Sequence, residues 1–320
     1  MNTQKWLLKR EYWEHKGGFF FFFVVISAII SLFTIGSLII ATVLGQNSGM
    51  HFGGNSEMSI QVALSKVTEP DKIEFAQGLA NGYPLIGAPI MIAMVFVVFF
   101  YCLGALFDDR KDRSILFWKS LPISDRDTVL SKLITASLVA PIIAIVSVLA
   151  MSLFILFVFM VIVAFHGLNL FGYVLSNPDF YLTTVKSFTI IPIYALWALP
   201  TIAYLLFVSS WAKTKPFLWA VGVPVLGGVI ISWMNALLDL GWDMSSFWKF
   251  ISLRWFGSLV PGSWFSNSEG VHLDDKSQGF GDLILQSYQQ FAHLNLWIGI
   301  VIGVAFILAA IQMRRYRDEG

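Results

Sequence analysis

The side chains that most often bind metals or carry out catalysis are few in this chain and lie far apart. Its five histidines are His15, His51, His166, His272 and His293. No two of them lie three or four residues apart beside a carboxylate, as a helical metal site requires. The single cysteine, Cys102, excludes an internal disulfide and a four-cysteine zinc site, and its apolar neighbours indicate a small buried hydrophobe. We expect no metal site.

Sequence motifs for catalysis are absent as well. The chain contains no G-x-x-x-x-G-K-[ST] phosphate-binding loop, no G-x-S-x-G nucleophile turn and no H-E-x-x-H zinc motif. We therefore expect that the chain is not itself an enzyme and binds no cofactor. Its net charge of +1 argues against a nucleic-acid partner, because such proteins neutralise phosphates with an excess of Lys and Arg.

The segment 108–132 carries the most informative pattern. It opens with charged residues, namely Asp108, Asp109, Arg110, Lys111, Asp112 and Arg113. The aspartates lack the alternating oxygen ligands of a calcium loop, so we expect them to pair with these neighbouring cations or with basic residues of a partner. Ser114 is a candidate cap of a short helix that Pro122 ends, and Ser124 with Asp127 forms a capping-box pattern before the next helix.

An apolar run follows the charged residues, and it includes Ile115, Leu116, Phe117, Trp118 and Leu121. Leaving such a run exposed to water is costly unless it meets lipid or a protein groove. Two interpretations follow: a docking helix for another protein, or an interfacial helix that rests on lipid headgroups.

The composition of the whole chain predicts the helices that position this segment. The chain is 57% hydrophobic and only 13% charged, against about 25% charged residues in soluble domains. Six apolar runs each approach the roughly 20 residues that cross a hydrocarbon core. The predicted spans are 19–44, 84–107, 133–165, 189–210, 217–238 and 294–312, and none contains a charged residue or histidine. The sequence thus predicts an all-α, multi-pass membrane protein with one domain, 19–312.

The distribution of positive charge predicts the orientation. Of the 21 Lys and Arg residues, 15 fall in residues 1–18, 108–132, 211–216 and 313–320, which alternate with the other connections. Connections rich in Lys and Arg face the cytoplasm. Both termini, including the tail 313–320, are therefore predicted to be cytoplasmic. The third span is longer than a bilayer needs, and we expect it to kink at Pro141.

Over residues 101–135 the chain resembles the permease subunit of ABC-2 type exporters. The likeness rests on the charged cluster, on Ser-Ile-Leu-Phe-Trp-Lys-Ser-Leu-Pro-Ile-Ser at 114–124, and on Val129-Leu130-Ser131-Lys132. It implies the ABC-2 permease fold, a second copy of the chain, and two copies of a separate ATPase subunit that binds ATP and magnesium. The coupling residues would be Ser114, Ile115, Leu116, Phe117, Trp118, Lys119, Ser120, Leu121 and Pro122.

Two further segments have aromatic patterns. Residues 1–18 mix tryptophan and tyrosine with lysine and arginine, which favours an interfacial helix ending at Gly17-Gly18; in the resembled family it is a connecting helix. The outer connection 239–293 is rich in rings, so we expect short helices that dip into the membrane. The resemblance implies an outer gate here, with Phe247, Trp248, Trp255 and Phe256 as candidates. An aromatic belt without a gating role is the alternative.

These features together predict a permease in a bacterial plasma membrane that exports an amphiphilic or hydrophobic substrate, such as a peptide, lipid or drug-like molecule. Energy would come from the ATPase partner, because the predicted spans hold no charged group to carry a coupling ion. Membrane lipids are the remaining expected partner. The alternatives are a secondary carrier or channel that needs no ATPase, and a membrane scaffold protein that does not transport.

Overall fold

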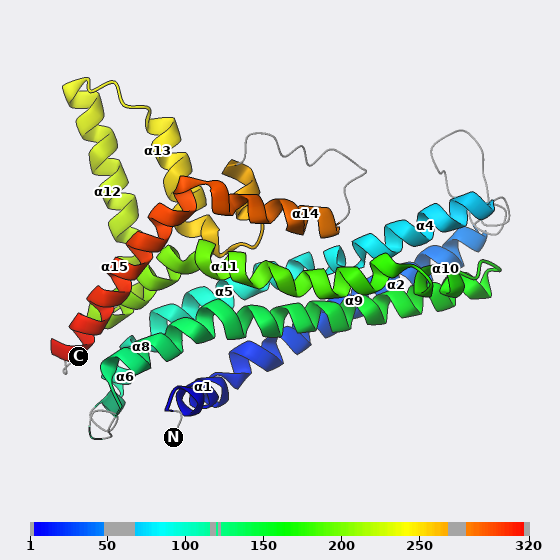
Figure 1. Cartoon of the computed structure of the whole chain (residues 1–320), viewed down its shortest axis with the longest axis horizontal. Coiled ribbons are helices and arrows are strands. Elements are labelled where there is room, and N and C mark those ends of the chain that lie inside the picture. Colours follow the sequence, from blue (N-terminus) through cyan, green and yellow to red (C-terminus); the bar gives the residue numbers. More distant parts are fainter. Residues whose placement is uncertain (1–2, 48–67, 116–119, 121–122, 268–279, 317–320) are drawn as a thin grey trace.

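A computed structural model describes residues 3–47, 68–115, 120, 123–267 and 280–316, and all regular secondary structure in these ranges is helical (Figure 1). Six helical runs are long and apolar enough to cross a membrane. They are Gly17–Val43, Glu69–Lys111, Asp125–Phe165, Pro178–Trp211, Pro216–Leu238 and Leu294–Tyr316. The prediction of an all-helical chain with six apolar runs of spanning length is therefore confirmed for the described residues.

The N-terminal helix and the first span are joined without a break at the glycines. Their elements are α1 (Thr3–Glu14), the π turn η1 (Gly17–Phe21) and α2 (Phe22–Asn47). We predicted that the first helix ends at Gly17-Gly18; α1 ends at Glu14, shortly before these glycines, and η1 begins at Gly17. The backbone N–H of Phe19 donates to the carbonyl of His15 at 3.0 Å, and Phe19 and Phe23 are buried, so packing holds the chain helical through the glycines.

The second span is part of a much longer helical run than predicted. Its elements are α4 (Glu69–Gly82), the 3₁₀ turn η2 (Tyr83–Gly87), α5 (Ala88–Ala105) and α6 (Phe107–Lys111). The helix begins before the span predicted to start at 84, because Thr68 caps it by donating from its backbone N and Oγ1 to Asp71 Oδ2. Pro84, which lacks a backbone donor, is accommodated in the 3₁₀ turn.

The helical run that contains the third span begins at Ser124, the predicted N-cap. The elements of this run are α8 (Asp125–Ile134), the π turn η3 (Thr135–Val139) and α9 (Ala140–Phe165). The backbone N–H of Asp127 donates to Ser124 Oγ at 3.1 Å, which confirms the predicted cap. The helix widens into the π turn just before Pro141 and remains helical through that proline, and the kink expected there stays a prediction.

The remaining spans follow after a short helix. The elements are α10 (Phe171–Leu175), α11 (Pro178–Trp211), α12 (Pro216–Leu238) and α15 (Leu294–Tyr316). Helix α11 starts well before the predicted residue 189, because Asn177 caps it by accepting from the backbone N–H of Asp179 at 2.9 Å. Helix α15 continues past the predicted end at 312 into the expected tail, and Arg314 is buried there.

Short helices occur in the described parts of the connection 239–293, which are 239–267 and 280–293, and the expectation that they dip into the membrane stays a prediction. They are α13 (Met244–Phe250), the π turn η4 (Ile251–Phe256), the 3₁₀ turns η5 (Gly257–Leu259), η6 (Ser263–Asn267) and η7 (Tyr288–Ala292), and α14 (Phe280–Ser287). In Figure 1, α12 and α13 lean away from the long helices, whereas η5 and α14 pack against α11.

Helix α11 is at the centre of the fold and packs against α5, α9 and α15. Gly299 and Gly303 of α15 allow this helix to approach α11 closely. A Cβ atom at Gly303 would come within 2.8 Å of Leu199 Cδ2 and 3.2 Å of the backbone N of Pro200. Both chain ends lie at the same end of the bundle, beside α6 and α8 (Figure 1).

Gly303→Leu tests the packing of α15 on α11. The added side chain overpacks the contact and should cost about 1–3 kcal/mol of stability, measured as a lower melting temperature of the detergent-solubilised protein. Gly222→Leu on α12 is the matched control, because its Cβ would meet no atom within 4 Å. Equal melting of both variants and the wild type would contradict the described packing.

Candidate functional site

A buried cluster of charged side chains lies where α1, α6, α8 and the last turn of α15 meet. We call it the ionic junction, and its members are Arg10, Glu11, Asp109, Asp125, Lys132 and Arg314. It contains three cations and three anions, so its formal charges cancel. The cluster lies at the end of the bundle that holds both chain ends (Figure 1).

Lys132 on α8 is the centre of the ionic junction. Its side chain is 1% exposed, and Nζ lies 3.1 Å from Glu11 Oε1 and 3.4 Å from Asp109 Oδ2. A buried ammonium group is tolerated only when carboxylates replace the water that it loses. Lys132 therefore ties α8 to α1 and to α6.

Arg314 in the last turn of α15 extends the network. Its Nη1 lies 3.4 Å from Asp109 Oδ2, and its Nε lies 3.0 Å from Asp125 Oδ1. The helix dipoles favour this arrangement, since Arg314 lies near a helix C-terminus and Asp125 in the first turn of α8. Asp109 is thus shared by two cations from two helices.

Glu11 is completely buried, and both of its carboxylate oxygens have partners. Arg10 Nη2 lies 2.7 Å from Oε1, and the hydroxyl of Tyr101 on α5 donates to Oε2 at 2.8 Å. Gln4 makes a second tie from α1 to α8, since its Nε2 donates to Asp127 Oδ1 at 2.7 Å. Helix α1 is therefore held by polar contacts to α5 and α8.

The short helix α6 is fastened to α11 by Arg110 and Ser209. Arg110 is buried, and its Nη2 donates to the carbonyls of Ser209 at 2.6 Å and Ala212 at 2.9 Å, which are unpaired carbonyls at the end of α11. Ser209 Oγ accepts from the backbone N–H groups of Leu106 and Phe107 where α5 ends and α6 begins. Our prediction that the aspartates and arginines of 108–113 pair with one another is wrong for Asp109 and Arg110, because both reach other helices.

Few of the predicted coupling residues lie within the described part of the chain. Ser114 is helical itself and follows Arg113, which has a φ of 56°; its Oγ donates to the carbonyl of Asp109 at 3.2 Å instead of capping the helix. Ile115 is buried in its own chain, so it is not an exposed contact residue, whereas Ser120 is helical and exposed. The others, Leu116, Phe117, Trp118, Lys119, Leu121 and Pro122, lie outside the described residues.

The four predicted gate residues lie on two successive elements, α13 and η4, and the two tryptophans among them pack against the spans. Trp248 Nε1 donates to Ser232 Oγ of α12 at 3.0 Å, and the ring covers Gly228. Trp255 packs edge-on against Tyr204 of α11, with ring centroids 5.0 Å apart. Phe247 lies beside Trp248, and Phe256 is half-buried. Their gating role stays a prediction.

Arg254 is a buried cation in this region that the sequence analysis did not single out. Its Nη1 donates to the carbonyl of Trp197 at 2.8 Å, and its guanidinium lies 3.9 Å from the centre of the Trp197 ring. Burial lowers the pKa of Arg254 to about 10, so the group remains charged at neutral pH. It fastens η4 to the middle of α11.

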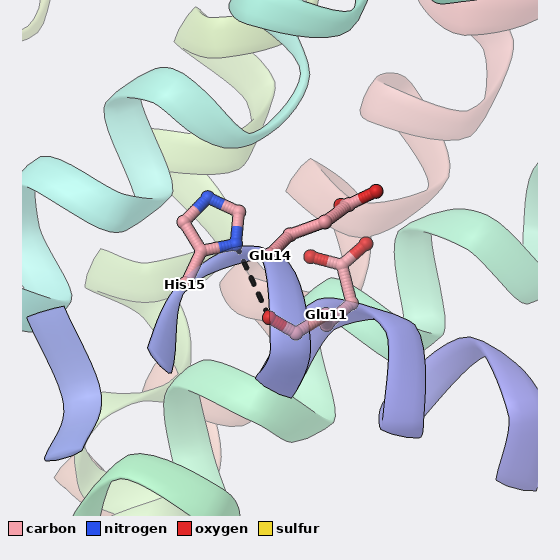
Figure 2. A group of neighbouring side chains, drawn as sticks. All are labelled: Glu11, Glu14 and His15. Carbon is pink, nitrogen blue, oxygen red and sulfur yellow. Dashed lines mark hydrogen bonds between the residues drawn. The ribbon is translucent and has the colours of Figure 1, made fainter. Parts of the chain in front are cut away.

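Glu11, Glu14 and His15 lie close together on and just after α1 (Figure 2), with potential ligand atoms within 4.8 Å of one another. This grouping does not fit a metal site, because Arg10, Lys132 and Tyr101 already bind the carboxylate of Glu11. The group is better described as the edge of the ionic junction.

Comparison of the chain with protein-family models, with curated proteins and with solved structures finds no match.

The ionic junction was not predicted from the sequence. Its members are separated by up to hundreds of residues, and the pattern of the apolar runs placed Lys132 and Arg314 just outside the spans. One signal was present: Glu11 is an acidic residue within the basic and aromatic segment 1–18.

Lys132→Met tests the ionic junction. It leaves Glu11 and Asp109 buried without their shared cation, and breaking a buried pair typically costs about 3–5 kcal/mol. The expected result is a large drop in melting temperature.

Lys72→Met, which breaks the exposed pair of Lys72 with Glu69, is the control and should change melting little. Adding Glu11→Gln to Lys132→Met should produce a loss smaller than the sum of the two single losses, because the residues interact directly. Strict additivity would contradict the described contact.

Proposed function

We propose that this chain is the membrane-spanning permease subunit of an ATP-binding cassette exporter of the ABC-2 type. In this proposal a separate subunit hydrolyses ATP, and the chain works as a dimer in a bacterial plasma membrane with both termini in the cytoplasm. The substrate is amphiphilic or hydrophobic.

One observation carries the proposal beyond the resemblance of residues 101–135. Asp109 lies before the predicted coupling residues 114–122, Asp125 lies after them, and both bind Arg314 of α15. Asp109 also binds Lys132, which binds Glu11 of α1. Both ends of the segment are therefore clamped to the same set of helices.

Such clamping suits a segment that transmits force. A push on a loop with free ends would be absorbed by bending of the loop. A force that moves Asp109 and Asp125 would pass to α15 through Arg314 and to α1 through Glu11. Arg110 would pass the same movement to the end of α11. An ATPase that closes against this segment could thus act on three elements at once.

The positions of the charged residues also support ATP hydrolysis by a partner subunit as the energy source. The helices are longer than the predicted spans and carry Asp109, Asp125, Lys132 and Arg314 in their terminal turns. These groups are engaged with one another, so they support a structural role better than the uptake and release of a coupling ion. A secondary carrier or channel, and a scaffold protein, are the competing functions that the experiment must separate.

Co-purification with an ATP-binding subunit encoded beside this gene tests the proposal. The wild-type chain should retain that subunit in detergent. Replacing both Phe117 and Trp118 with alanine should reduce retention by about tenfold or more, since buried aromatic anchors dominate interfaces. The measurement is the ratio of the two subunits after affinity purification.

Trp242→Ala is the matched aromatic control, because Trp242 is exposed and follows α12. It should leave retention unchanged. Failure of the wild-type chain to retain the subunit, together with ion-gradient-driven flux in liposomes that contain this chain alone, would establish a secondary carrier or channel instead. Retention without substrate-stimulated ATP hydrolysis would favour the scaffold.

A further inference from the structure

A groove of about 580 Å³ lies between α5 and the junction of α1 with η1, at the edge of the ionic junction. Its volume falls in the range of small-molecule sites, which is roughly 300–1,000 Å³. Glu14, His15 and Asp108 line it where α1 ends and α6 begins. Elsewhere its walls are apolar.

The apolar part of the groove opens onto the outer surface of the helix bundle. Phe96 and Phe100 of α5 and Phe22 of α2 line it and are exposed, whereas Phe19 is buried behind them. Exposed phenylalanines on spanning helices face lipid. The rise along α5 between residues 96 and 104 is about 12 Å, so the groove offers a largely apolar track of about that length below its carboxylates.

Glycines keep this space open. Gly17 and Gly18 line the groove, and a Cβ atom at either would meet nothing within 4 Å. The opposite wall includes Gly104, where a Cβ would come within 2.6 Å of Asp108 Oδ2. The missing side chains thus leave room for a ligand and let the carboxylate of Asp108 lie close against α5.

The polar end of the groove favours a cation. Asp108 is exposed and forms no salt bridge with any residue that the structure describes, and Glu14 has one, to Arg10 at 3.3 Å. His15 Nδ1 lies 3.2 Å from the carbonyl oxygen of Glu11, which can only accept (Figure 2). The proton of a neutral ring is therefore on Nδ1, which leaves Nε2 as an acceptor. An anionic headgroup would meet two carboxylates and be repelled.

We propose that this groove binds an amphiphilic amine, with the protonated amino group at Asp108 and Glu14 and the apolar chain along Phe96 and Phe100. Its position at the cytoplasmic end of the spans makes it an entry site from the inner leaflet. That role rests on the proposed export function, whereas binding of the amine does not require an ATPase.

Saturable binding of radiolabelled dodecylamine tests the proposal. The full-length chain is placed in nanodiscs of phosphatidylcholine, and binding to empty nanodiscs is subtracted. Asp108→Asn combined with Glu14→Gln should weaken binding by about tenfold or more, because charge-assisted hydrogen bonds to the amine are lost. Asp112→Asn, which removes an exposed carboxylate beside the groove, should leave it unchanged.

A second variant tests the groove by its volume instead of its charge. Gly18→Leu should abolish saturable binding without a clash, and Gly36→Leu on α2, whose Cβ would also meet nothing within 4 Å, should not. Thermal melting of each variant separates loss of binding from loss of fold.

Three results would overturn the proposal: no saturable binding to the wild type, equal binding of neutral dodecanol, or unchanged binding in Gly18→Leu. Complete displacement of the amine by phosphatidylethanolamine added to the nanodisc would assign the groove to a resident aminolipid and would overturn its role as an entry site for an exported substrate. Because no ATPase is present in these measurements, their outcome is independent of the co-purification result.

Discussion

The fold depends on a lysine that cannot remain buried alone. Lys132 lies inside the protein with its ammonium group between Glu11 and Asp109, and the loss of water around three charges is offset only if all three stay together. This requirement fixes where α1 lies against α8 and where α6 ends. Arg314 adds the last helix to the same set of contacts, so the first and last described helices are held by one network.

The apolar runs were sufficient to predict the helical class and six runs of spanning length, because hydrophobic length is a local property of the chain. The helix ends were predicted less well. Thr68 and Asn177 begin helices well before the apolar residues do. Pro84 lies in a 3₁₀ turn and a π turn precedes Pro141, and no apolar pattern marks either turn. Only the Ser124 cap was marked clearly enough in the sequence to be predicted and confirmed.

The ionic junction and the groove beside it could not be predicted in the same way. Charges at positions 11, 109, 132 and 314 come together only once the helices have packed, and nothing in their local sequence pairs Asp109 with Arg314 in preference to its neighbour Arg110. The groove depends on Gly17 and Gly18 remaining within a helical run, where the sequence favoured a helix end. The sequence shows which residues are charged, but which of them form ion pairs depends on how the helices pack.

The most direct test of the account is photocrosslinking in intact cells from p-benzoylphenylalanine placed at position 118. The account predicts a crosslink between this chain and an ATP-binding subunit, because the segment clamped at Asp109 and Asp125 would be held against that partner. Crosslinks to phospholipid alone, with no other polypeptide attached, would contradict it.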